Sequence, residues 1–254
     1  MTLAADNLTL TRGGRAVVEG LSAMLAPGQI TAIVGPNGAG KSSLLLGLAG
    51  LLTPAAGAVM LDGSPLASLH PRTRAQAIGY LPQSADVAWD VAVEALVALG
   101  RLPWRDRGEA AIAAAIAALD LEPLRHRPIS QLSGGERARV LLARVLAGEP
   151  RWILADEPLA ALDLAHQLRL IAHLRACARG ELGAGQGRET GVVVVLHDLG
   201  IAMNHADRVL VLNDGALIAD GAPEEALAPE VIARGWSVTA RWLGDPGARA
   251  LIAG

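Results

Sequence analysis

The stretch Gly35-Pro36-Asn37-Gly38-Ala39-Gly40-Lys41-Ser42 decides the fold of this 254-residue chain. It fits the spacing G-x-x-x-x-G-K-[ST] and lies between an apolar run, Ile30 to Val34, and an apolar helical segment that begins near Lys41. Glycines allow successive backbone N–H groups to surround phosphate oxygens, and a helix start adds unpaired donors and a positive dipole end. The strand–loop–helix context therefore predicts a phosphate-binding loop in an α/β protein.

Two side chains of this loop have expected roles of their own. Lys41 is expected to reach the terminal phosphates of a nucleotide, and the Ser42 hydroxyl is expected to bind Mg²⁺. A glycine-rich turn without a ligand is the alternative, and such a match arises by chance about once per hundred chains of this length. The flanking strand and helix favour the phosphate site.

A second polar motif follows the apolar run Trp152 to Ala155, which ends in Asp156 and Glu157. Ligands of open α/β sheets bind at the carboxyl ends of the strands. Asp156 is therefore expected beside the phosphate loop, where it would hold Mg²⁺ through water, while Glu157 would orient or deprotonate an attacking water. A strand that simply ends in a polar loop is common. This motif alone is therefore weak evidence for a catalytic site, and the surrounding motifs have to support it.

The remaining pattern predicts a mostly parallel sheet with additions at both ends. Runs that are apolar at consecutive positions, Val192 to Leu196 and Val209 to Leu212, indicate further strands buried on both faces. Alternation from Leu3 to Leu25 favours antiparallel strands. Residues 42–61 are predicted to form a helix, a turn and a strand, and residues 91–124 to form helices with an apolar stripe of Ile112, Ile116 and Leu119. Residues 179–191 are predicted to form an exposed loop. Pro223-Glu224-Glu225 is predicted to start a further helix.

The composition narrows the functional classes. With 22 basic and 25 acidic residues and no long basic stripe, there is no electrostatic argument for nucleic-acid binding. The single cysteine, Cys177, excludes an internal disulfide and fits a reducing cytoplasm. We expect no signal peptide, because Asp6 and Arg12 interrupt any early apolar core. We also expect no membrane span, because Pro54 would break a helix over the uncharged stretch 42–61. The absence of Phe and the single Tyr predict an aliphatic core.

A third motif, Leu132-Ser133-Gly134-Gly135-Glu136, reads locally as a helix start capped by Ser133. It resembles the signature sequence of the ABC ATPase family, and a chance match arises in about one chain per thousand. Further elements resemble that family in the same order along the chain: the Q-loop glutamine Gln83 in Tyr80-Leu81-Pro82-Gln83, the D-loop Ala161-Leu162-Asp163, and the switch histidine His197 in Leu196-His197-Asp198. The other histidines match nothing and are interpreted as surface residues.

The resemblance implies a homodimer in which two copies face each other head to tail. ATP would lie on the phosphate loop of one copy, residues 35–43, and under the signature of the other, Ser133, Gly134, Gly135 and Glu136. Of these four residues, Ser133 and Gly135 would bind its γ-phosphate. Ser42, Gln83 and Asp156 would serve the Mg²⁺ site. Glu157 would act on water, His197 would contact the γ-phosphate, and Asp163 would line the dimer seam.

The resemblance also implies the fold, an α/β P-loop NTPase core with a mostly parallel sheet, an N-terminal antiparallel β subdomain and a helical signature subdomain. The whole chain is then a single ABC ATPase domain. Residues 1–84 and 150–222 form its core with the antiparallel part, residues 85–149 the helical subdomain, and residues 223–254 a C-terminal helical tail.

Three positions depart from the family pattern. Arg12 stands where the family usually has an aromatic ring on adenine, and its guanidinium would either stack on the base or point into solvent. Ser43 replaces the common Thr, which is a mild change. Leu159 replaces the usual Thr after Glu157-Pro158, but the neighbouring acids are intact, so an active ATPase is expected.

Other segments resemble the importers of iron–siderophore, haem and cobalamin, namely Val93 to Trp104, Leu196 to Leu199 and Gly221 to Leu227. This likeness implies integral-membrane permease subunits, a periplasmic or surface substrate-binding protein, and a location on the cytoplasmic face of the bacterial inner membrane. The region from Gln83 to Trp104 would receive a permease helix. The alternatives are an exporter motor and a soluble non-transport ABC ATPase, although residues 42–132 leave no room for the long coiled coil of the DNA-repair type.

Overall fold

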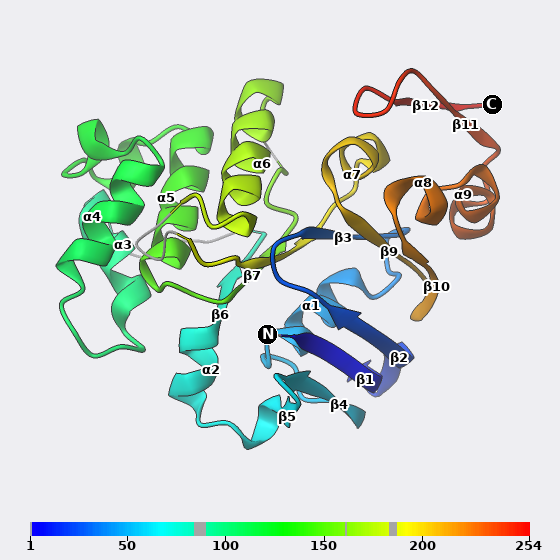
Figure 1. Ribbon diagram of the computed structural model, residues 1–254, viewed down its shortest axis with the longest axis horizontal. Coiled ribbons are helices and arrows are strands. Elements are labelled where there is room, and N and C mark those ends of the chain that lie inside the picture. Colours follow the sequence, from blue (N-terminus) through cyan, green and yellow to red (C-terminus); the bar gives the residue numbers. More distant parts are fainter. Residues whose placement is uncertain (1, 84–89, 161, 183–186) are drawn as a thin grey trace. The chain divides into compact units, whose positions relative to one another are not determined.

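The computed structural model describes residues 2–83, 90–160, 162–182 and 187–254 (Figure 1). The chain divides into two compact units. One comprises Met1–Leu69 with Val193–Gly254, and the other comprises His70–Val192. Strand β8 (Gly191–Val195) carries the chain from the second unit back into the first.

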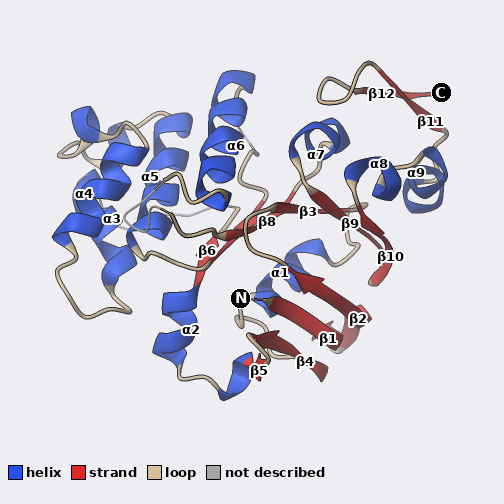
Figure 2. Ribbon diagram, in the orientation of Figure 1, coloured by secondary structure: helices blue, strands red, loops and turns tan. Residues whose placement is uncertain are grey.

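The first unit begins with a four-stranded antiparallel sheet in the order β2-β1-β4-β5. Its strands are β1 (Leu3–Arg12), β2 (Arg15–Leu25), β4 (Ala56–Leu61) and β5 (Ser64–Pro65). Leu3 and Ala5, and after a register shift Leu8 and Leu10, are the buried residues of β1. Helix α1 (Lys41–Leu48) packs against β1, as Figure 2 shows. The predicted antiparallel N-terminal part is confirmed.

The same unit contains the strands that surround the phosphate loop. Strand β3 (Ile30–Val34) pairs in parallel with β9 (Arg208–Asn213), and β10 (Ala216–Gly221) pairs with β9 in the opposite direction. All five residues of β3 are buried. This is the burial that a strand covered on both faces requires, and it explains why the neighbouring residues Ala32, Ile33 and Val34 are all apolar.

The second unit combines two parallel strands with a group of helices. Strand β6 (Ile78–Leu81) pairs with β7 (Trp152–Asp156). Helices α3 (Val93–Ala98), α4 (Glu109–Ala118) and α5 (Gly134–Ala147) pack on one another (Figure 1). Ile112, Ile116 and Leu119 are all buried, as their spacing predicts. The unit also contains α2 (Pro71–Ala77), α6 (Leu164–Ala178) and the short 3₁₀ turns Leu99–Arg101, Glu122–Leu124 and Ile129–Gln131.

The C-terminal segment differs from the predicted helical tail. The helices of the first unit that follow β8 are α7 (Leu199–His205), α8 (Pro223–Ala226) and α9 (Pro229–Trp236). A 3₁₀ turn, Leu66–Ser68, lies earlier in the same unit. Ser237 ends α9 with a left-handed φ of 57°. The chain then forms an antiparallel hairpin of β11 (Ala240–Leu243) and β12 (Ala250–Ala253). The helical prediction is therefore wrong beyond Trp236, because Trp242 Nε1 donates to Leu227 O and fastens the hairpin.

Two further predictions need correction. The core is not purely aliphatic, because Trp152 is 1% exposed and is among the largest fully buried side chains. A Cβ on Gly191 would lie 2.2 Å from the Trp152 ring, so glycine at 191 makes room for the indole. The segment 179–191 is only partly exposed, since Gly180, Thr190 and Gly191 are buried; its residues 183–186 lie outside the described residues.

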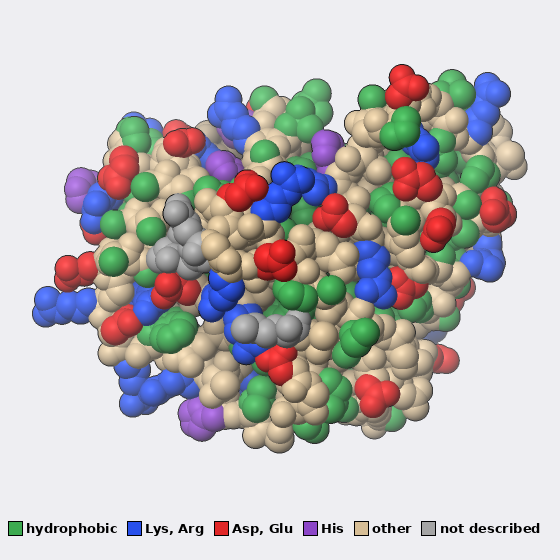
Figure 3. Space-filling model, in the orientation of Figure 1, with side chains coloured by type: hydrophobic (Ala, Val, Ile, Leu, Met, Phe, Trp, Pro, Cys, Tyr) green, Lys and Arg blue, Asp and Glu red, His purple; other side chains and the backbone are tan. Residues whose placement is uncertain are grey.

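The uncharged stretch 42–61 forms helix α1, a turn and strand β4, as expected. Among the residues that the structure describes, no helix has both the length and the apolar character that crossing a bilayer requires. Acidic and basic side chains are mixed over the face drawn in Figure 3. The boundaries expected for the helical subdomain, 85–149, stay a prediction; α3, α4 and α5 fall within them.

Candidate active site

The predicted site residues divide between the two units. Arg12, His197 and the phosphate loop 35–43 belong to the first unit, while Gln83, Asp156, Glu157, Asp163 and residues 133–136 belong to the second. Within each unit, the turns that follow the strands determine which of these side chains lie close to one another.

The phosphate loop joins the buried end of β3 to the start of α1. Gly35 has a φ of 153° and Gly40 a φ of 97°, and a Cβ at either position would lie 2.1 Å from a backbone oxygen, that of Leu212 for Gly35 and that of Val17 for Gly40. The loop can therefore approach its neighbours this closely only with glycine at both positions. Within the loop, Ala39 N donates to Pro36 O at 3.2 Å and closes the turn.

Lys41 is the charged group of this loop and is only 5% exposed. Its Nζ donates to Gly35 O and Pro36 O, both at 2.9 Å. A buried ammonium beside this loop is placed where it can also attract phosphate oxygens. Ser42 is half-buried, Ser43 is buried, and Asn37 and Gly38 at the loop tip are exposed. These residues fit a nucleoside triphosphate.

His197 lies near the same end of β3. Leu196 N donates to Ile33 O at 3.0 Å, so the residue that follows β8 is fastened to β3 two residues before the phosphate loop begins. His197 is exposed, and Asp198 caps α7 by accepting from Ile201 N at 3.0 Å. Arg12 is exposed at the end of β1, where it pairs with Arg15 across the turn. Its stacking on adenine stays a prediction.

The acidic motif ends strand β7 in the second unit. Asp156 is only 6% exposed, and the Tyr80 hydroxyl lies 3.4 Å from its Oδ2. Because β6 and β7 run in parallel with Leu81 opposite Ala155, the residues that follow the two strands meet at one edge. Gln83 Nε2 donates to Glu157 Oε2 at 2.5 Å. The structure thus brings together the predicted Q-loop glutamine and the predicted catalytic carboxylate.

Glu157 has an unusual backbone, with a φ of 47°. This left-handed conformation is uncommon for a residue with a side chain and costs on the order of 1 kcal/mol. Pro158 and Leu159, which follow, are buried and hold the turn in place. Asp156 and Gln83 offer the oxygen ligands that Mg²⁺ prefers, and this ion commonly uses one or two protein carboxylates together with substrate phosphates. The donor set fits that ion.

The signature motif forms the N-terminus of α5 as predicted. Ser133 Oγ accepts from Glu136 N at 3.3 Å, and Ser133 N donates to Glu136 Oε2 at 2.8 Å, which together make a capping box. Hydrogen bonds to the Glu136 carboxylate, first from the Ser133 backbone and then from the Ser133 side chain, lower the pKa of Glu136. The S-x-x-E spacing would have revealed the box from the sequence alone. Gly134 is exposed and Gly135 is buried.

The D-loop leads into α6. Asp163 caps this helix, since its Oδ1 accepts from His166 N at 2.9 Å and lies 2.8 Å from His166 Nδ1. Ala161 of the predicted motif lies outside the described residues. The remaining histidines were expected to be surface residues. His70 and His126 are exposed, as expected, but His166, His173 and His205 are half-buried.

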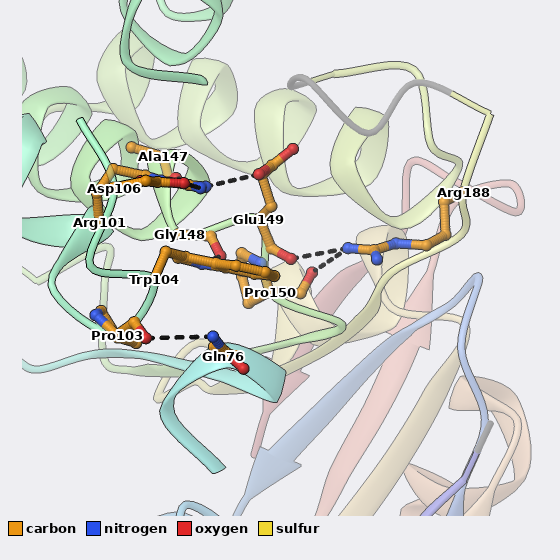
Figure 4. Close-up of polar contacts among 10 residues, drawn as sticks. All are labelled: Gln76, Arg101, Pro103, Trp104, Asp106, Ala147, Gly148, Glu149, Pro150 and Arg188. Atoms are coloured by element: carbon orange, nitrogen blue, oxygen red, sulfur yellow. Dashed lines mark hydrogen bonds and ion pairs between the residues drawn. The ribbon is translucent and has the colours of Figure 1, made fainter. Parts of the chain in front are cut away.

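The segment expected to receive a permease helix is firmly anchored at its end; its residues 84–89 lie outside the described residues. Arg101 is 6% exposed, and its guanidinium donates to Ala147 O at 3.1 Å and to Glu149 Oε2 at 2.6 Å (Figure 4). The same guanidinium pairs with Asp106 and lies 4.8 Å from the Trp104 ring centroid. Sequence reasoning did not single out Arg101.

Trp104 and its neighbours complete this anchor. Trp104 Nε1 donates to Gly148 O at 2.9 Å, and Gln76 Nε2 donates to Pro103 O at 3.1 Å (Figure 4). Meanwhile Leu99, Leu102 and Trp104 are 44%, 69% and 37% exposed. The polar groups therefore fix a short segment that still presents apolar side chains to its surroundings.

Comparisons with known proteins agree with this geometry. The ABC transporter family model matches residues 18–160. The chain is 46% identical to the hemin import ATP-binding protein HmuV of Nocardia farcinica over 92% of this chain and 82% of that protein, and 42% identical to the protein of that name from Myxococcus xanthus over 97% and 95%.

Solved structures give the same result at the level of the fold. A putative metal-chelate type ABC transporter in an inward-facing conformation matches with a TM-score of 0.81 and 26% identity, over 100% of this chain and 96% of that one. The cbiO1 protein from Clostridium perfringens, part of the ABC transporter complex cbiONQ, matches with a TM-score of 0.77 and 28% identity, over 91% and 92%.

Proposed function

The chain belongs to the ABC transporter family and is an ATPase, and from that premise we propose that it is the motor of an importer for haem or a related iron chelate. In this proposal two copies work as a homodimer at the cytoplasmic face of the cell membrane. They act on separate permease subunits, which a periplasmic or surface binding protein supplies with substrate.

The proposed roles are assigned from the family motif that each residue matches. Lys41 and the backbone N–H groups of the loop hold the phosphates of ATP in the loop of one copy. Ser133, Gly134, Gly135 and Glu136 of the second copy present a helix N-terminus to the same ATP, with Asp163 at the seam. Ser43 and Arg12 complete the nucleotide site. His197 contacts the γ-phosphate.

Hydrolysis requires a water that is oriented for in-line attack. Glu157 is the residue proposed to orient that water and accept its proton. Ser42, Asp156 and Gln83 would hold Mg²⁺, which supplies charge neutralisation at the phosphate oxygens when it is bound. Lys41 adds a fixed positive charge from its buried position.

The observation that carries the motor proposal is the hydrogen bond from Gln83 to Glu157. Gln83 begins the segment that ends in the anchored, apolar residues Leu99, Leu102 and Trp104. A helix of the permease docked on those side chains would bias the position of Gln83, and thereby the freedom of the Glu157 carboxylate. Transport and hydrolysis would be coupled through this one contact.

The importer and its substrate are supported by the relatives, which are named hemin import ATP-binding proteins and match most of the chain. An exporter motor is the second candidate, because a bacterial Atm1-family ABC exporter matches with a TM-score of 0.75 and 29% identity over 93% of this chain. The soluble non-transport class remains the third.

Two experiments test the proposal. The Glu157→Gln variant is expected to bind ATP and accumulate as a dimer, with hydrolysis reduced by about 10²-fold or more; hydrolysis at the parent rate would refute the role of Glu157. The chain co-purified with its permease in proteoliposomes is expected to hydrolyse ATP faster when the haem-loaded binding protein is added outside. Stimulation by substrate presented on the ATPase side would instead favour the exporter.

A further inference from the structure

We propose that His166 is a positioning residue that holds the D-loop and the signature helix in one arrangement, so that both are presented together to the ATP of a second copy. This inference rests on the proposed function, because it concerns surfaces that act only in the dimer. The contacts that carry it all lie within the second unit.

The first contact fixes the imidazole to the D-loop. Asp163 Oδ1 lies 2.8 Å from His166 Nδ1 and also accepts from the backbone N of His166. A carboxylate accepts hydrogen bonds, so Nδ1 carries a proton in this arrangement. The bonds from His166, first that from its backbone, lower the pKa of Asp163. The ring is therefore held in one orientation by a charged acceptor.

The second contact places the ring on the signature helix. A Cβ built on Gly135 would lie 1.9 Å from His166 Cδ2, 2.4 Å from Nε2 and 2.5 Å from Cγ. The imidazole thus fills the space that a side chain at 135 would need. Gly134 provides the comparison within the same motif, because a Cβ there would meet nothing within 4 Å.

This difference explains why glycine is required at 135. Gly135 does not have a left-handed φ, so its backbone conformation would accept other residues. What excludes them is the His166 ring, which is only 29% exposed and packs directly on the helix start. Removal of the ring would separate the D-loop from the signature while leaving both segments present.

The next residue strengthens the same arrangement. Gln167 Nε2 donates to Leu159 O at 3.3 Å and to Leu162 O at 3.1 Å. The first turn of α6 therefore holds the loop that begins after Glu157 at both of its ends. Asp163 keeps a side chain that is 67% exposed, so the residue remains available to a second copy.

The main test measures dimer formation in the Glu157→Gln background, by mass photometry over a dilution series with Mg-ATP. His166→Ala is expected to raise the dimer dissociation constant about tenfold, which corresponds to about 1.4 kcal/mol. The affinity of the monomer for a fluorescent ATP analogue is expected to stay within about twofold, because the phosphate loop belongs to the other unit. His166→Asn, whose amide can donate to Asp163 in place of Nδ1, is expected to recover most of the dimer.

The outcomes separate the two proposals. If Glu157→Gln with His166 intact remains monomeric in Mg-ATP, the proposed function fails and this inference fails with it. If that protein dimerises and His166→Ala dimerises equally tightly, only the role of His166 is refuted. Parallel losses of dimerisation and of ATP affinity in His166→Ala would also refute it, because they indicate a general loss of structure.

A stability cycle tests the contact itself. Gly135→Ala is expected to lower the melting temperature by about 4 °C or more relative to the control Gly134→Ala, because only the former meets the ring. In a His166→Ala background, the loss caused by Gly135→Ala is expected to fall to less than half. An equal loss in both backgrounds would show that His166 is not what excludes a side chain at 135.

Discussion

Replacement of Arg101 by methionine isolates the anchor of the segment that leads from the Q-loop to Trp104. Methionine keeps an unbranched apolar side chain in the buried space and removes the guanidinium. The variant loses the bonds to Ala147 O and Glu149 Oε2, the pairing with Asp106, and the stacking on Trp104. We therefore expect a protein that folds but is measurably less stable.

The magnitude follows from the exposure of the partners. A bond from a charged donor to a buried carbonyl, here Ala147 O, contributes about 1.5–3 kcal/mol. The pair with Glu149, whose side chain is 28% exposed, adds at most about 1 kcal/mol. Asp106 is half-exposed and returns to water. The expected loss is roughly 2–3 kcal/mol, which lowers the melting temperature of a domain of this size by about 5–10 °C.

Calorimetry at pH 7 measures this shift directly. The matched control is Arg107→Met, since Arg107 is 93% exposed and its distance to Glu109 is 3.9 Å. The control is expected to melt within about 2 °C of the parent. An Arg101→Met protein that melts as closely to the parent as the control does would refute the reasoning, because the buried guanidinium would then contribute nothing.

Two further predictions concern titratable groups. Burial raises the pKa of Cys177 to about 12 and leaves it 2% exposed, so Ellman's reagent at pH 8 is expected to label the native chain slowly and the urea-unfolded chain rapidly; fast native labelling would contradict this. The pKa of Glu136 is lowered by its bonds to Ser133, so the stabilisation by its carboxylate is fully present above the unfolded pKa of about 4.3 and is lost as pH falls through the folded pKa. The difference in melting temperature between the parent and Glu136→Gln is therefore expected to shrink below about pH 4, and a difference independent of pH would refute it.

The phosphate loop could be predicted from the sequence because its determinants are local. The buried run of β3, the glycines at 35 and 40 and the first turn of α1 are contiguous, and each has one physical reason to be there. The capped start of α5 was predictable for the same reason, since Ser133 and Glu136 satisfy each other within one turn. Patterns of this kind require no knowledge of the tertiary structure.

Contacts between distant segments could not be predicted in this way. Gln83 and Glu157 are 74 positions apart, and their hydrogen bond depends on the pairing of β6 with β7. The interpretation of His166 as a surface residue failed because nothing near it in the sequence reveals that Gly135 lies against its ring. The C-terminal hairpin was missed because a helix start at Pro223 says nothing about how the chain packs beyond that helix.

The conformation of Glu157 shows why the identity of a proposed catalytic residue is easier to predict than the contacts that hold it. The sequence places an acid after a buried strand, but it does not reveal the left-handed φ of 47°. That conformation is unfavourable by itself, while Pro158 and Leu159 beside it are buried and Gln83 donates to its carboxylate. A residue held in this way by a donor on another segment responds when that segment moves. Under the proposed function, the Gln83–Glu157 bond would therefore link a movement of the Q-loop segment to the freedom of the acid.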